Sequence, residues 1–107
     1  MTETSRCTWD PSTFTATAIY TGENRLIRVR GSGTCPTGGF SAELVADNAG
    51  INPDPSELVV RIEETAPDVG PDVLSPLDVD STFEVDFGVH YVVVRALDLR
   101  IDVKEPA

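Results

Sequence analysis

Two cysteines and one histidine are the residues of this sequence best suited to covalent chemistry. Cys7 precedes the first predicted strand, and Cys35 lies in a glycine-rich loop, Gly-Ser-Gly-Thr-Cys-Pro-Thr-Gly-Gly. A thiolate in such a loop could act as a nucleophile, with backbone amides binding an oxyanion and His90 as the base. His90 falls within the most apolar predicted strand, however, where a lone imidazole usually packs. We therefore expect no catalytic site, and keep a thiol enzyme using Cys35 as an alternative.

The same two cysteines could form a disulfide if the chain is exported to an oxidising compartment. The first residues, Met-Thr-Glu-Thr-Ser-Arg, contain no apolar signal region, so we expect a cytoplasmic protein with two reduced thiols. A mature exported domain in which Cys7 and Cys35 are bridged is the alternative. A zinc site would need four ligands, and only His90 could join the two cysteines. We therefore expect no cofactor.

Oxygen-rich loops make calcium the metal that requires consideration. Oxygen donors come in two segments. The first contains Asp47, Asn48, Asn52, Asp54 and Glu57, and the second contains Asp68, Asp72, Asp78 and Asp80. Calcium binds six to eight such oxygens, but the spacing does not match the helix-flanked calcium loop, and prolines interrupt the first segment. A calcium-binding domain therefore stays an alternative to ordinary acidic turns.

The charge of the chain excludes several classes of partner. Eighteen acidic residues against eight basic ones give a formal net charge of −10. Binding to a phosphate backbone depends on cationic groups, so we expect no nucleic acid, and anionic membrane surfaces are disfavoured for the same reason. No apolar stretch is long enough for a membrane-spanning helix, so we expect no membrane insertion. A protein partner is the expectation that remains, and the oligomeric state is left open.

Two-residue alternation of apolar and polar residues predicts the elements that must position these groups. The predicted strands are 13–20, 25–31, 40–46, 57–64, 83–87, 89–96 and 97–104. Prolines at 67, 71 and 76 indicate a long connection over 66–80, with a short edge strand near Asp72–Leu74. No stretch has helical periodicity for more than one turn, so the protein should be all-β.

This pattern favours a single antiparallel two-sheet β-sandwich of six or seven strands over 1–107, with 1–8 and 104–107 frayed. The architecture is immunoglobulin-like, but Trp9 precedes the first predicted strand, whereas immunoglobulin domains carry their tryptophan on a later one. The likeness is therefore to the architecture alone. A small β-barrel is the alternative fold.

A rigid β scaffold with long loops and no catalytic set is typical of a non-enzymatic binding or accessory module. The loops 31–39 and 66–80 carry residues that no strand requires, and we take Thr34, Cys35, Pro36, Thr37, Asp68 and Asp72 as the binding candidates. Alternatives are a structural subunit that pairs through a sheet edge, and a small-ligand carrier if the fold is a barrel. Arg28, Arg30 and Arg61 could form a cationic stripe on one sheet, but we expect them to form salt bridges with Glu43 or Glu63 across strands.

Overall fold

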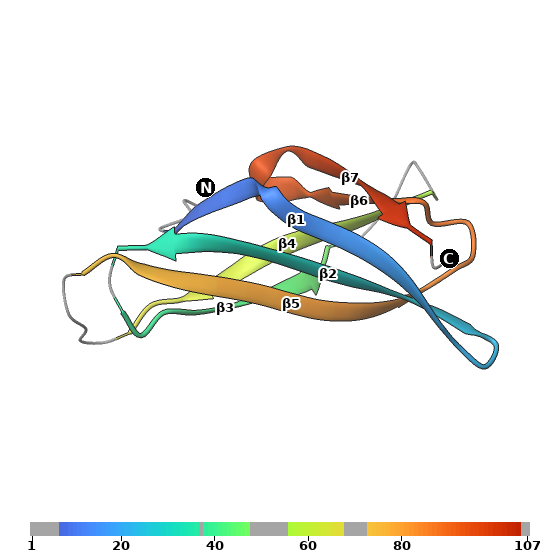
Figure 1. Cartoon of the computed structure of the whole chain (residues 1–107), viewed down its shortest axis with the longest axis horizontal. Coiled ribbons are helices and arrows are strands. Elements are labelled where there is room, and N and C mark those ends of the chain that lie inside the picture. The colour runs from blue at the N-terminus through green and yellow to red at the C-terminus, as the bar shows by residue number, and fades with distance from the viewer. Residues whose placement is uncertain (1–6, 37, 48–55, 68–72, 106–107) are drawn as a thin grey trace.

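The computed structural model of the chain describes residues 7–36, 38–47, 56–67 and 73–105 (Figure 1). Strands dominate this part of the chain, as the alternation predicts, so the all-β class is confirmed. The elements are β1 (Thr8–Thr21), β2 (Asn24–Cys35), β3 (Ser41–Ala46), β4 (Glu57–Thr65), β5 (Ser75–Val85), β6 (Tyr91–Val94), the 3₁₀ helix η1 (Arg95–Leu97) and β7 (Leu99–Lys104).

The strands form one mixed sheet in the order β3-β4-β6-β7-β1-β2-β5. Two neighbouring pairs, β1 with β7 and β4 with β6, are parallel, and the other four are antiparallel. The expected antiparallel two-sheet sandwich is therefore wrong. Parallel neighbours need long crossovers, and the alternation within a strand does not report which strands such crossovers bring together.

The sheet curls until its two end strands, β3 and β5, contact each other. In Figure 1, β1, β2 and β5 run side by side at the front, and β3 and β4 lie behind them. The arrangement is close to a closed barrel, so the small-barrel alternative describes it better than a sandwich. A curled sheet brings the inward faces of distant strands together around one core.

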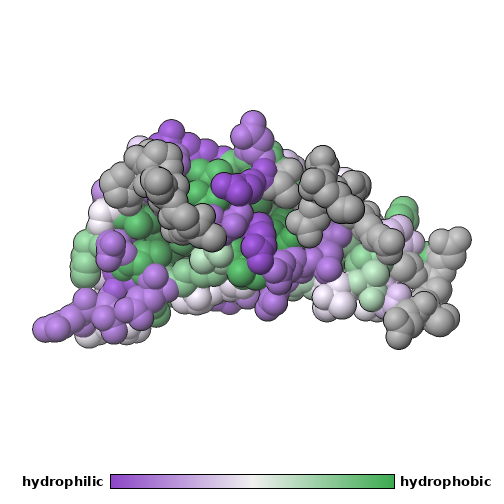
Figure 2. Space-filling model, turned by 180° about the vertical axis from the view of Figure 1, so that it is seen from behind, coloured by the Kyte–Doolittle hydropathy of each residue, from purple (hydrophilic) through white to green (hydrophobic). Residues whose placement is uncertain are grey.

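The core contains most of the side chains that alternation assigned to the inner face, but Tyr20, Ala46 and Phe87, at the ends of their runs, are exposed. In β1, Phe14 and Ala16 are buried while Thr15 and Thr17 are exposed. The most deeply buried apolar side chains come from three strands: Ile27 and Val29, Val60, and Val92 and Val94. On the face turned away from the viewer of Figure 1, apolar side chains also reach the surface between hydrophilic ones (Figure 2).

Strand β1 begins earlier than predicted and contains a large irregularity. Asp10 pairs with Ser32 and Thr15 with Arg30, so residues 11–14 lie opposite Gly31 alone. The insertion lets the Phe14 ring lie directly against the Gly31 backbone, where the Cβ of any other residue would clash with the ring carbons. Such a bulge redirects one side chain, and here it directs an aromatic ring into the core.

Strand β5 extends into the segment predicted to be a loop. It begins at Ser75 and pairs with β2 along its length, including Pro76 opposite Thr34. β5 ends the hydrogen-bonded order, the position at which a sheet tolerates proline. The edge strand expected near Asp72–Leu74 does not form over Val73 and Leu74, and Asp72 lies outside the described residues.

The predicted strands 89–96 and 97–104 are shorter than expected because the chain turns between them. β6 ends at Val94, the 3₁₀ helix follows, and Asp98 adopts a left-handed conformation with φ 49° before β7 begins. The ends expected to fray fall partly outside the described residues, but Thr8 already belongs to β1 and Lys104 still belongs to β7.

Candidate functional site

The two loops that the sequence selects for binding lie side by side in the structure. Thr34 pairs with Pro76, and Cys35 pairs with Ser75, where the end of β2 runs beside the start of β5. The paired residues are about 40 positions apart in the chain. Because neighbouring strands of a sheet lie roughly 5 Å apart, the pairing brings these residues side by side. One end of the molecule therefore combines the described parts of both loops.

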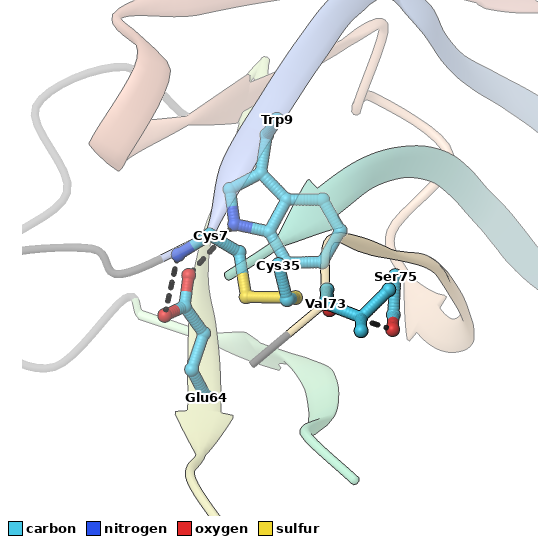
Figure 3. The surroundings of a disulfide bond; sticks show 6 residues. All are labelled: Cys7, Trp9, Cys35, Glu64, Val73 and Ser75. Atoms are coloured by element: carbon cyan, nitrogen blue, oxygen red, sulfur yellow. Dashed lines mark hydrogen bonds between the residues drawn. A yellow bond between two sulfur atoms is a disulfide. The ribbon is translucent and has the colours of Figure 1, made fainter. Parts of the chain in front are cut away.

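A disulfide joins Cys7 to Cys35 at this end (Figure 3). The expectation of two reduced thiols does not hold in the structure, and the bridged alternative does. Both cysteines are buried, with 4% and 1% of their surfaces exposed. The bond ties Cys7, which directly precedes β1, to the last residue of β2.

The carboxylate of Glu64, on β4, holds the same end together from the other side of the core. Its Oε1 accepts a hydrogen bond from the Cys7 backbone N–H at 3.3 Å, and its Oε2 accepts one from Trp9 Nε1 at 2.8 Å (Figure 3). The Trp9 ring is buried and meets Phe14 edge to face, with ring centroids 6.4 Å apart. Sequence reasoning did not pair Glu64 with Trp9, because β1 and β4 are not neighbours in the sheet.

Beside the buried disulfide, apolar side chains face solvent. Val73 is 61% exposed and Leu74 is 72% exposed, and the Ser75 hydroxyl donates a hydrogen bond to the Val73 carbonyl at 3.1 Å. We call the exposed residues of this end the disulfide-end surface; its members are Thr34, Pro36, Val73, Leu74 and Pro76. Of the sequence candidates, Cys35 lies buried beneath it, whereas Thr37, Asp68 and Asp72 lie outside the described residues.

The geometry offers little to a thiol enzyme. Cys35 has no free thiol, because it is disulfide-bonded. His90 is exposed in the connection before β6, contrary to its predicted place within a strand, and its backbone N–H donates to the Ser56 carbonyl. Its neighbour Val89 contacts Arg25 at the far end of β2 from Cys35. Cys35 and His90, the proposed nucleophile and base, therefore lie near opposite ends of β2.

Four of the calcium candidates lie in described segments: Glu57, Asp78, Asp80 and Asp47. Glu57 pairs with Arg100 and Asp80 with Arg28, and Asp47 is paired as well. The Asp47 carboxylate forms ion pairs with Arg61 and Arg95, at 3.7 and 3.0 Å, and so is already neutralised by cations. Asn48, Asn52 and Asp54 lie outside the described residues. Within the residues that the structure describes, three or more histidine, cysteine or acidic side chains nowhere gather as a metal site would require.

The surface arginines form ion pairs, with partners that differ from those expected. Arg28 Nε donates to Asp80 Oδ1 at 2.9 Å, and Arg30 approaches the same carboxylate. The hydrogen bond from Arg28 and the arginine charges lower the pKa of Asp80 below its ordinary value. Arg61 does pair with Glu63, but along the same strand and not across strands. These arginines are therefore not a free cationic stripe.

One buried cation went unpredicted. Arg25 is only 1% exposed, yet its guanidinium is fully engaged: Nη1 donates to the carbonyls of Val89 and Asp86, Nη2 to Glu105, and Nε to the Tyr20 hydroxyl. Burial lowers the pKa of Arg25, but the hydrogen bonds to Tyr20 and Glu105 outweigh it and raise that pKa overall. Alternation places Arg25 inward with Ile27, and this pattern is the sequence signal that could have identified it.

Over the part of the chain that the structure describes, no helix has the length and apolar character needed to span a membrane. Comparison of the chain with protein-family models, curated proteins and solved structures finds no match in any of the three.

Proposed function

We propose that this chain is a non-enzymatic binding module that recognises another protein through the disulfide-end surface. The observation that carries the proposal is the exposure of Val73 and Leu74 directly beside a buried disulfide. Exposed large apolar side chains are the usual anchors of a protein interface, since their transfer out of water stabilises the complex. At roughly 25 cal/mol per Å² of buried apolar surface, two such side chains would contribute a few kcal/mol.

The scaffold beneath this surface supports binding because it is held in place before a partner arrives. The disulfide fixes the end of β2, Glu64 links β4 to Trp9, and the pairing of β5 with β2 fixes the residues that follow Leu74. A surface that is ordered in advance loses little conformational entropy on association. The net charge of −10 argues against nucleic acid as the partner.

The disulfide also bears on where such a module would work. We infer that the chain folds in an oxidising compartment, because a buried disulfide persists there, whereas cytosolic reductants keep most thiols reduced. This replaces the cytoplasmic expectation with the exported alternative. Mass spectrometry of alkylated protein from its native cells would test it: two unmodified cysteines support export, and two alkylated ones contradict it.

The test of the proposed function compares partner capture by three versions of the tagged chain in its native cells, after cross-linking. The double variant Val73→Ser with Leu74→Ser removes the apolar anchors. The control combines Thr17→Ser with Thr82→Ser, at exposed positions of β1 and β5. We expect the wild type and the control to retain the same stoichiometric protein, and the anchor variant to lose it. Equal retention by all three would contradict the proposal.

A further inference from the structure

A second exposed apolar pair lies at the opposite end of the molecule. Tyr20, near the end of β1, and Phe87, after β5, have ring centroids 6.0 Å apart and planes inclined by 36°. Tyr20 is 45% exposed and Phe87 is 61% exposed. Tyr20 pairs with Arg25 at the end of β2 that lies farthest from Cys35, so this aromatic end is separate from the disulfide-end surface.

Buried Arg25 positions both rings. Its Nε donates to the Tyr20 hydroxyl at 3.2 Å, and Tyr20 in turn donates to Glu105 Oε1 at 2.9 Å. Its Nη1 donates to the carbonyls of Asp86 and Val89, at 3.2 and 2.6 Å, and these two residues bracket the turn that carries Phe87. The ring pair is therefore held by a hydrogen-bonded network, and is not a chance meeting of two surface side chains.

Three exposed carboxylates lie close in sequence to the aromatic end, and its basic neighbours are His90 and Lys104, both beside Glu105. Glu23 lies in the β1–β2 turn, Glu84 pairs with Leu26 next to Arg25, and Asp86 precedes Phe87. All three are exposed, and no ion pair in the described part of the chain involves their side chains. Arg25 is buried, and its charge is paired with the carboxylate of Glu105. A ligand at this end thus meets Glu23 and Asp86 close to the two rings, whereas Glu84 lies on the other face of the sheet from Tyr20 and Arg25.

We propose that the Tyr20–Phe87 pair is a docking surface for an arginine or lysine side chain of a basic protein segment. The face of an aromatic ring attracts a cation, and nearby carboxylates add to that attraction. A second copy of this chain would bring a further charge of −10, which opposes self-association. A neutral sugar carries no charge to complement the nearby carboxylates, whereas a cationic side chain does.

Fluorescence anisotropy with a labelled, Nα-acetylated hexa-arginine amide tests this surface directly. The variant Phe87→Ser removes one ring without changing the charge of the chain, and Thr82→Ser, at an exposed position of β5 outside both surfaces, is its control. We expect Phe87→Ser to bind the peptide roughly 2- to 30-fold more weakly than wild type, as the range for cation–π interactions implies. Thr82→Ser should bind as the wild type does.

A charge-matched pair of variants separates a local site from general attraction to an acidic protein. Glu23→Gln with Asp86→Asn removes two charges at the aromatic end, and Glu43→Gln with Asp78→Asn removes two elsewhere. The first pair should weaken peptide binding more than the second. Equal binding by wild type and Phe87→Ser, or equal losses in the two charge variants, would overturn the proposal. So would Phe87-dependent dimerisation in sedimentation equilibrium, which would make a second copy the occupant. None of these three results bears on the disulfide-end surface.

Discussion

Glu64 accepts a hydrogen bond from the indole Nε1 of Trp9 at 2.8 Å, and so joins β4 to β1 across the core, although these strands are not neighbours in the sheet. The same carboxylate accepts the backbone N–H of Cys7. A single acidic side chain therefore connects the far side of the curled sheet to the disulfide. The order of the disulfide-end surface depends on this contact as well as on the covalent bond.

Replacing Glu64 by alanine should therefore destabilise the protein. The change leaves the buried Trp9 N–H without its acceptor, and we expect the free energy of unfolding to fall by roughly 1–3 kcal/mol. Urea unfolding followed by Trp9 fluorescence measures the effect. Glu63→Ala is the matched control, because Glu63 pairs with the partly exposed Arg61, and losses there should stay below about 1 kcal/mol. Equal losses in the two variants would show that the Trp9 contact is unimportant.

The disulfide should supply a large share of the stability. Replacing Cys7 and Cys35 together by serine removes a cross-link between positions 28 residues apart. Loss of a native disulfide from a small domain costs about 2–5 kcal/mol, in large part through the greater freedom of the unfolded chain. Urea unfolding of the double variant should show this loss. An unchanged urea midpoint would mean that the bond adds nothing to folding.

Stability should fall in acid through Glu105. The hydrogen bonds from Tyr20 and Arg25, with the Arg25 charge, lower the pKa of Glu105 below its ordinary value, against some desolvation. A lowered folded-state pKa gives stability that is present above the unfolded value, near pH 4.5, and is lost as the pH falls through the folded value. Glu105→Gln should therefore be less stable than wild type at pH 7, and the gap should close in acid. Urea midpoints between pH 7 and about pH 2.5 measure it; a gap independent of pH would contradict this role.

The bulge of β1 leads to a prediction about Gly31. A Cβ at this position would clash with the ring of Phe14, so Gly31→Ala should cost about 1–3 kcal/mol through overpacking. At Gly88 an added Cβ meets nothing within 4 Å, which makes Gly88→Ala the control. Thermal unfolding of both variants tests the difference. Adding Phe14→Leu to Gly31→Ala should recover part of the loss, and a loss that it leaves unchanged would argue against the ring as its cause.

The alternation of apolar and polar residues sufficed to predict most strands. Successive side chains of a strand point to opposite faces, so apolar residues at every second position indicate a strand with one face in the core. Ile27 and Val29 illustrate this, since both are buried while Arg28 and Arg30 between and after them are exposed. The order of the strands could not be predicted in the same way. Parallel neighbours such as β4 and β6 are far apart in the chain, and their pairing depends on the whole core.

The candidate site was predicted in outline. Both loops were identified because Thr34 and Pro36 belong to no alternating pattern, but their meeting depends on Pro76 entering β5, which proline argued against. The aromatic end was missed for a different reason. Arg25 is the first residue of the predicted strand 25–31, and alternation places it inward, but its partner Glu105 lies at the other end of the chain. Contacts between distant residues of this kind leave no periodic signal.

Site-specific photo-cross-linking from the disulfide-end surface tests the binding-module account most directly. A photoreactive phenylalanine analogue would replace Leu74 in one version of the chain and Thr17, on the exposed face of β1, in another. Both versions would be illuminated in native cells, and the adducts identified by mass spectrometry. The account predicts one predominant protein adduct from position 74 and none of that identity from position 17. The same mixture of adducts from both positions, or none from position 74, would contradict it.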